Sequence, residues 1–178
     1  MKSIITRLFF IVLTIQSCTN SATSIQKITC KMKLIPERAI LCSKTISMDL
    51  GPADQIIGYS MVKGQVLSIL KREIAESIFS IEIEKRKTFI KNIDEMASNE
   101  NVMSYKSGRT GEISLSIDPG NYIICTQSKR DSSTNQPILS CEPANLKMNH
   151  KYKLLIIDNP RAGIQFEWKE KRPPNMSL

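Results

Sequence analysis

Five cysteines are the residues of this chain whose chemistry is easiest to anticipate: Cys18, Cys30, Cys42, Cys125 and Cys141. Because five is an odd number, one thiol must stay outside any set of intramolecular disulfides. Local bridges Cys30–Cys42 and Cys125–Cys141 are favoured, since strand-like runs joined by a plausible turn flank each pair. A loop of this size, once closed, would stabilise the fold by about 3 kcal/mol. Four cysteines still permit three pairings, so the sequence leaves the connectivity open.

Side chains that could catalyse a reaction are few. The single histidine, His150, lies in a loop-like stretch, and a nucleophile of the Ser-His-Asp or Cys-His type would need a partner to orient it. Glu82 and Glu84 share one face of an expected strand about 7 Å apart, but nearby lysines favour a solvated face. The sequence contains no CxxC or Cys/His cluster for zinc, no HExxH and no phosphate-binding glycine loop. We therefore expect no enzyme, no catalytic residue, no metal and no cofactor.

The first seventeen residues have the features of an export signal. Lys2 and Arg7 give a positive start, and Leu8–Ile15 is a compact apolar run. Eight residues rise only about 12 Å as a helix, well short of the roughly 30 Å hydrocarbon core of a bilayer. A cleavable secretory signal is therefore a better interpretation than a transmembrane span. Export would also bring the cysteines into an oxidising compartment.

The residues around Cys18 resemble the bacterial lipobox. In Ile15-Gln16-Ser17-Cys18 an aliphatic residue stands three positions before the cysteine and a small residue just before it, while Gln16 departs from the usual small or aliphatic residue. The resemblance implies that diacylglycerol alkylates the Cys18 thiol, that the signal is cut before it, and that the new amine is acylated. Thr19 stands where an Asp would favour inner-membrane retention, which implies an outer-membrane anchor. The alternative is an ordinary signal cut nearby, with Cys18 left as a spare thiol.

The charge of the chain is basic. The formal net charge is +8, and removal of residues 1–17 leaves 23 basic against 17 acidic residues, or +6. Such a chain favours anionic neighbours, including lipid headgroups and acidic glycans. Only Lys85-Arg86-Lys87 and residues 169–172 cluster, and aromatic residues make up 6% of the chain, so a nucleic-acid surface is not expected. We expect membrane contact through the lipid anchor and a protein or anionic glycan partner.

Alternating apolar and polar residues predict a β fold. The alternation is clearest at Glu112–Ile117. Asp118-Pro119-Gly120-Asn121 then predicts a type II turn, because proline presets φ at the second position and glycine accepts positive φ at the third. Since Tyr122–Gln127 resumes a strand, we expect these two strands to pair as an antiparallel hairpin.

Further strands are expected at regular spacing. They cover residues 62–70 (with Gly64 as a candidate bulge), 78–85, 138–141, 152–157 and 163–169. Ile164, Phe166 and Trp168 alternate with polar residues, which favours core positions over a carbohydrate-stacking patch. A short helix or turn is expected only near residues 71–77 and 94–101. Many short strands separated by turn signals indicate an antiparallel β-sandwich of about seven strands.

The chain divides into five expected parts. They are a signal peptide at 1–17, a small polar tether at 18–26, an N-terminal hairpin at 27–54 that turns near Pro36, a β-sandwich at 55–170 and a flexible tail at 171–178. A length of 178 residues suits one domain with a real core.

From about Met61 to Phe166 the order of features resembles the carboxypeptidase-regulatory-like, or transthyretin/prealbumin-like, β-sandwich family. Lys63-Gly64-Gln65-Val66 matches its opening strand, Gly111–Ile117 its Gly-x-aliphatic-x-Leu-x-aliphatic strand, and Pro119-Gly120 with Tyr122 its Pro-Gly-x-Tyr signature. The usual Thr-Asp ahead of the glycine is missing. The resemblance implies a structural turn at Pro119, Gly120 and Tyr122, with the tyrosine hydroxyl in water.

The function expected from the sequence is a non-catalytic lipoprotein of the bacterial cell envelope that serves as a binding or structural module. The alternative is a periplasmic inhibitor or a secretion or assembly-factor lipoprotein that binds a protein partner. Neither the fold resemblance nor any motif identifies the ligand.

Overall fold

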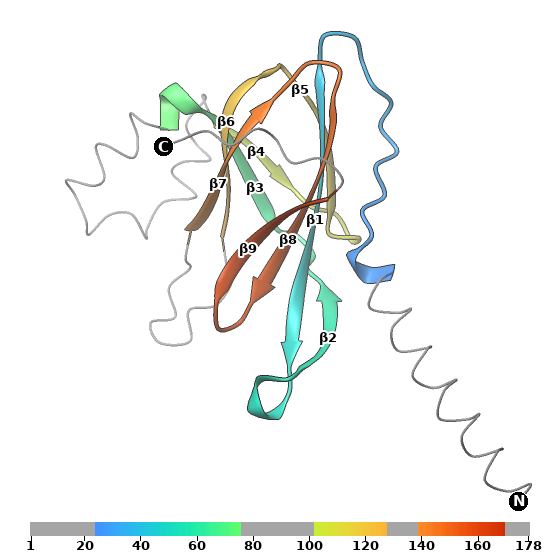
Figure 1. Ribbon diagram of the computed structural model, residues 1–178, viewed down its shortest axis with the longest axis vertical. Helices are drawn as coiled ribbons and strands as arrows, with labels where there is room; N and C mark the ends of the chain where they lie inside the picture. Colours follow the sequence, from blue (N-terminus) through green and yellow to red (C-terminus); the bar gives the residue numbers. More distant parts are fainter. Residues whose placement is uncertain (1–23, 76–101, 128–138, 170–178) are drawn as a thin grey trace, which may run out of the picture.

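The computed structural model describes residues 24–75, 102–127 and 139–169 (Figure 1). Its described strands are β1 (Ala39–Leu50), β2 (Ile56–Met61), β3 (Val66–Lys71), β4 (Val102–Lys106), β5 (Glu112–Ile117), β6 (Gly120–Gln127), β7 (Leu139–Leu146), β8 (Lys151–Asn159) and β9 (Gly163–Lys169), with a 3-10 turn η1 (Pro52–Asp54). They form two sheets packed face to face. The expected all-β sandwich is confirmed.

The first sheet has the order β2-β1-β8-β9, with β5 also paired to β1, and the second has the order β4-β3-β6-β7. Every described pair is antiparallel except β1 and β8, which run parallel. Parallel neighbours need a long connection between them, and here most of the described chain lies between the two strands.

Strand β1 is the centre of the first sheet. Its first half pairs with β5 and its second half with β2 along one edge, while β8 covers the other edge. The expected N-terminal hairpin at 27–54 is therefore wrong, because residues 27–35 form no strand and β1 belongs to the sandwich. β1 is buried on both faces along most of its length, although Ser43, Lys44 and Thr45 interrupt its apolar residues, so its sequence does not reveal its central place.

The main core lies between the two sheets. It takes one alternating face of most of the strands, including Leu41 of β1, Ile69 of β3, Ile124 of β6 and Leu154 of β8, all almost fully buried. Ile164, Phe166 and Trp168 of β9 pack against it at its margin, as expected from their alternation. The layer between the sheets thus supplies most of the hydrophobic stabilisation.

Two smaller cores cover the outer faces. Residues 27–35, called the strap from here on, run along the outside of the first sheet (blue in Figure 1). Ile28 of the strap packs with Ile40, Ile46 and Leu155 there. On the second sheet, a helical turn at 72–75 brings Ala75 against that sheet's outer face. This turn agrees with the helix expected near residues 71–77.

Strands β5 and β6 do not form the expected hairpin. Ile113, Leu115 and Ile117 enter the main core from the first sheet, whereas Tyr122 and Ile124 enter it from the second. The short connection therefore crosses from one sheet to the other. Gly120 has φ 157°, not the value near +80° of a type II turn, so the expected turn type is wrong.

The expected strand at 62–70 is also divided. β2 ends at Met61, residues 62–65 cross to the second sheet, and β3 begins at Val66. Gly64 has φ 68° at this crossing, and its amide donates to the Ser107 carbonyl. Gly64 therefore allows a sheet-to-sheet turn rather than a bulge within a strand.

Several expectations fall outside the described residues. They are the signal and lipobox at 1–18, the strand at 78–85 with Glu82 and Glu84, the stretch 94–101 and the tail at 171–178. Within the described ranges, no helix is long and apolar enough to cross a membrane.

Candidate functional site

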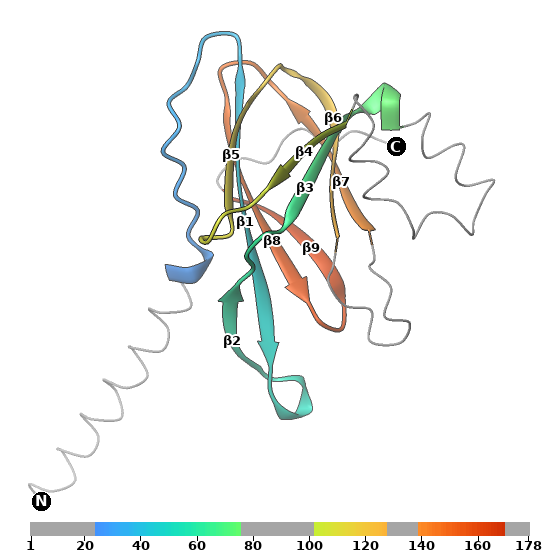
Figure 2. The same ribbon diagram turned by 180° about the vertical axis from the view of Figure 1, so that it is seen from behind.

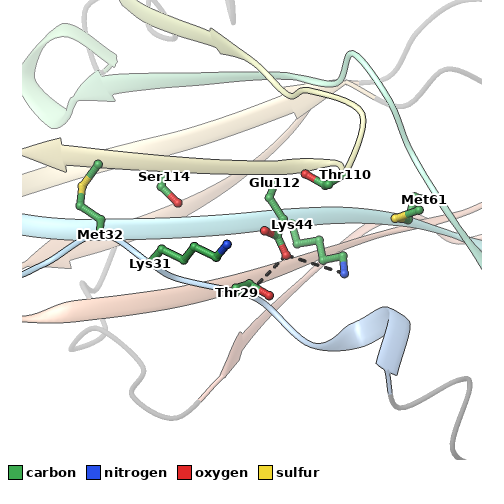
Figure 3. Close-up of a pocket in the computed structure, with 8 residues that line it drawn as sticks. All are labelled: Thr29, Lys31, Met32, Lys44, Met61, Thr110, Glu112 and Ser114. Carbon is green, nitrogen blue, oxygen red and sulfur yellow. Dashed lines mark hydrogen bonds and ion pairs between the residues drawn. The ribbon is translucent and has the colours of Figure 1, made fainter.

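An open groove of about 780 Å³ lies beside the strap on the outer face of the first sheet (Figure 3). Four segments line it: the strap with Thr29, Lys31 and Met32, β1 with Lys44, the end of β2 with Met61, and the start of β5 and the residues before it with Thr110, Glu112 and Ser114. The groove is therefore built where β1, β5 and the strap meet.

An ion pair between the buried Lys44 and the partly buried Glu112 lies in the groove. The residue Lys44 is 7% exposed, and its Nζ lies 3.8 Å from Glu112 Oε1. Lys44 and Glu112 are register partners on β1 and β5, which fixes their side chains next to each other. Lys44 Nζ also donates to the Lys27 carbonyl at 3.0 Å, and the Thr29 amide donates to Glu112 Oε1 at 3.1 Å. The pair thus ties the strap to both strands.

The remaining polar groups of the groove are hydrogen-bond donors and acceptors. Figure 3 shows the Glu112 carboxylate between the ammonium groups of Lys31 and Lys44. Hydroxyls of Thr29, Thr110 and Ser114 line the same space. No histidine, cysteine or aspartate is among the lining residues, and Glu112 is occupied by Lys44 and the strap. Cationic and hydroxyl groups arranged this way can hold an anionic, hydroxyl-rich ligand.

The expected disulfides are both present. Cys30–Cys42 joins the strap to β1, with Cα atoms 5.7 Å apart. Cys125–Cys141 joins the register partners of β6 and β7, with Cα atoms 4.1 Å apart. The sequence allowed three ways of pairing these four cysteines, and the structure has the one that consists of the two local bridges. The first bridge lies two residues from Lys44, so covalent and ionic contacts fasten the same part of the strap.

The residues of the expected structural turn hold the β5–β6 crossing together. Tyr122 is 2% exposed, and its hydroxyl donates to the Asp118 carbonyl at 2.9 Å. The hydroxyl is therefore not in water, contrary to expectation. Burial raises the pKa of Tyr122 above its ordinary value, and the Asp118 carboxylate adds to the rise. Arg38 donates to the Ser116 carbonyl and pairs with Asp118, which fixes the same crossing from outside.

The other residues considered from the sequence have structural contacts. His150 is partly buried, with Nδ1 2.8 Å from the Met148 carbonyl and its ring stacked on Tyr152. Trp168 Nε1 donates to Glu142 Oε1 at 3.2 Å, and its ring meets Tyr152 edge-on. In the described ranges, no group of three or more His, Cys, Asp or Glu side chains is arranged to hold a metal ion.

The sequence did not single out Lys44 and Glu112. One signal was available: Lys44 shares its strand face with Cys42 and Ile46, so alternation along β1 places a cation on an apolar face. A charge in that position needs a partner, which here comes from a strand almost seventy residues away.

Comparisons with known proteins add little to this description. No protein-family model matches the chain, and no curated protein matches it. Among solved structures, the chain is similar to one from Pseudomonas aeruginosa described as a "putative carbohydrate binding protein". The two are 10% identical with a TM-score of 0.43, over 71% of this chain and 92% of that chain. A likeness this distant carries no argument about ligand or function.

Proposed function

We propose that the protein is exported, anchored by lipid at Cys18 to the bacterial envelope, and acts there as a non-catalytic binding module. The cysteines carry this proposal. Four of the five lie in the two disulfides, which persist in oxidising compartments such as the periplasm. Cys18 is the cysteine left over, and it stands in the lipobox-like sequence. Acylation would explain a thiol that is otherwise a liability after export, and Thr19 favours the outer membrane.

The anchor is tested by Cys18→Ser. We expect the variant to accumulate as unprocessed precursor and to incorporate no radioactive palmitate, because a serine hydroxyl cannot form the thioether that precedes signal cleavage. Ser17→Ala is the matched control, since it keeps a small residue before the cysteine and should be processed and labelled normally. Palmitate incorporation that survives Cys18→Ser would end the lipoprotein proposal.

The groove beside the strap is the proposed ligand site, and an anionic glycan is the proposed ligand class. Lys31 and Lys44 supply positive charge, three hydroxyls supply donors and acceptors, and Met32 and Met61 supply apolar contact. A carboxylate or phosphate on the ligand would bond to Lys31, while Lys44 stays with Glu112. Sugar hydroxyls would match the threonine and serine side chains.

Substituting Lys31 should weaken that binding. We expect Lys31→Ala to lower the affinity for acidic oligosaccharides about tenfold, which is the usual loss when one charge-assisted hydrogen bond is removed. Lys33→Ala is the matched control, because Lys33 lies two residues further along the strap and does not line the groove. Calorimetric titration with uronic-acid oligosaccharides and peptidoglycan fragments gives the measurement. Equal affinities for the two variants, or no binding across the panel, would contradict the groove assignment.

A protein partner is the alternative, in keeping with an inhibitor or assembly factor. Strand β2 lies at the edge of the first sheet and contains no charged residue, and Ile56, Ile57 and Met61 are 54%, 68% and 47% exposed. Such an edge can accept a strand from another protein. Ile57→Lys would block strand addition at β2 and leave glycan binding in the groove unchanged, so the two functions are separable.

A further inference from the structure

We propose that one end of the sandwich makes a second, direct contact with an anionic lipid surface, in addition to the lipid on Cys18. The contact surface is the end patch, defined as Leu34 and Ile35 of the strap, Met148 in the β7–β8 loop, and the flanking Lys33 and Lys147. This contact deepens the proposed lipid anchoring and rests on it for the orientation of the molecule. Membrane binding by the end patch itself can be tested without the lipid.

Exposed apolar side chains gather at this end. Among the described residues, the exposed large hydrophobic side chains lie in two places, on β2 and in the end patch. In the patch, Leu34, Ile35 and Met148 are 52%, 44% and 54% exposed. Figures 1 and 2 both show the turn after the strap and the β7–β8 loop at the same end of the molecule, with β2 toward the other end.

Hydrogen bonds hold the two segments of the patch together. The Asn149 amide donates to the Arg38 carbonyl at 2.8 Å, and the Glu37 amide donates to Asn149 Oδ1 at 3.1 Å. The Arg38 amide closes the turn on the Ile35 carbonyl. The apolar side chains therefore project from a fixed pair of loops, so their exposure is a feature of the fold.

Positive charge flanks these side chains. Lys33 precedes Leu34 on the strap, and Lys147 precedes Met148 in the β7–β8 loop. Both lysines are exposed, and neither forms an ion pair with another described residue. Glu37 is the single acid of this stretch, and Arg38 is bound to Asp118.

Apolar side chains flanked by lysines are suited to a bilayer interface, where the apolar groups enter the headgroup region and each lysine near an anionic surface contributes about 1 kcal/mol. A second copy of the chain is a poorer occupant, since Lys33 and Lys147 of the two copies would then face one another in a protein whose net charge is already positive.

The length of the N-terminal segment allows this contact. Ser24, where the described structure begins, lies six residues along the chain from Cys18, and six steps can span at most about 20 Å. The strap from Lys27 to Leu34 covers a similar distance of about 23 Å in extended form. A tilted molecule can therefore have both its anchor and its end patch on one membrane.

Vesicle binding by an unlipidated chain tests the proposal. The protein is the chain from residue 18 onward with Cys18→Ser, which keeps every described residue and both disulfides. We expect it to sediment with phosphatidylglycerol–phosphatidylethanolamine vesicles at low salt and not with phosphatidylcholine vesicles. Lys33→Glu with Lys147→Glu should weaken binding about tenfold or more, and so should Leu34→Ser with Ile35→Ser and Met148→Ser. Ile56→Ser with Ile57→Ser is the control at β2 and should bind like the parent.

Any of the following results would overturn the proposal. Absence of binding to the anionic vesicles at low salt would do so, as would equal losses in the end-patch and β2 variants. Self-association that the end-patch substitutions abolish would assign the patch to a second copy instead. Palmitate labelling of the full chain, which these substitutions should leave intact, reports on Cys18 separately, so failure of the anchor and failure of the end patch are distinguishable.

Discussion

Replacement of Gly111 by alanine is expected to destabilise the protein by about 3 kcal/mol or more. Gly111 has φ 69°, which costs an L-residue about 1–2 kcal/mol. An added Cβ would also lie 2.8 Å from the Thr45 carbonyl oxygen and 2.9 Å from that of Val62. Because both atoms belong to the backbone, the crowding cannot be relieved by a side-chain rotation.

Gly111 is crowded because three segments of the backbone converge there. At Thr45 the edge of β1 changes partner from β5 to β2. The Thr45 amide donates to the Gly111 carbonyl at 3.0 Å, and the Val62 amide donates to the Thr45 carbonyl at 3.2 Å. A shift at Gly111 would disturb the pairing of β1 with both neighbours. The close approach of these backbones is a physical reason for the glycine before β5, which is part of the motif on which the family resemblance rests.

Gly163 supplies the matched control. It has φ 76° in the β8–β9 turn, and a Cβ there would meet no atom within 4 Å. Gly163→Ala should therefore cost only the backbone strain, about 1–2 kcal/mol. Urea unfolding of the mature chain, followed by circular dichroism, compares the free energies of unfolding. If Gly111→Ala were no more destabilising than Gly163→Ala, the convergence at Thr45 would be wrongly described.

Side-chain alternation predicted which residues face the core, but it could not predict which strands pair. Ile113, Leu115 and Ile117 alternate because one face of β5 is buried, and the same burial would result beside any neighbour. The strand itself was therefore predicted correctly and its partner wrongly: β5 pairs with β1, not with β6 across Pro119-Gly120.

Long-range pairing also explains why the N-terminal hairpin expected at 27–54 was wrong. The parallel neighbours β1 and β8 are separated by about a hundred residues, and no local pattern records that contact. The strap shows the same limit, since its apolar positions suggested a strand although they pack on a sheet face without joining it. The disulfides were predictable because each bridge closes a short loop, with sequence separations of 12 and 16.

The groove could be predicted least, because each of its walls comes from a different part of the chain. Thr29, Lys44 and Glu112 meet only after β1 pairs with β5 and the strap docks over both. The sequence predicted an anionic partner from net charge alone. The structure adds a particular place where Lys31 and the hydroxyl groups could meet such a partner.

Removal of one member of the Lys44–Glu112 pair is expected to be the second largest effect. Glu112→Ala should lower the free energy of unfolding by about 3 kcal/mol, because it leaves the Lys44 ammonium buried without a counter-charge. It also removes the acceptor of the Thr29 amide, which loosens the strap. We expect faster proteolysis after Lys27 and Lys31 in the native state, measured by mass spectrometry alongside the unfolding curves.

Removing both charges separates the ion pair from the packing around it. The double variant Lys44→Met with Glu112→Leu should recover stability to within about 1 kcal/mol of the parent, because a buried pair can be replaced by apolar side chains of similar size at little net cost. Asp54→Ala is the control for an ion pair in water, because Asp54 and its partner Arg161 are both at least half exposed. This substitution should lower the free energy of unfolding by less than about 1 kcal/mol. If the double variant were less stable than Glu112→Ala alone, then the hydrogen bond from Lys44 to the Lys27 carbonyl, rather than compensation of its charge, would be what this pair contributes.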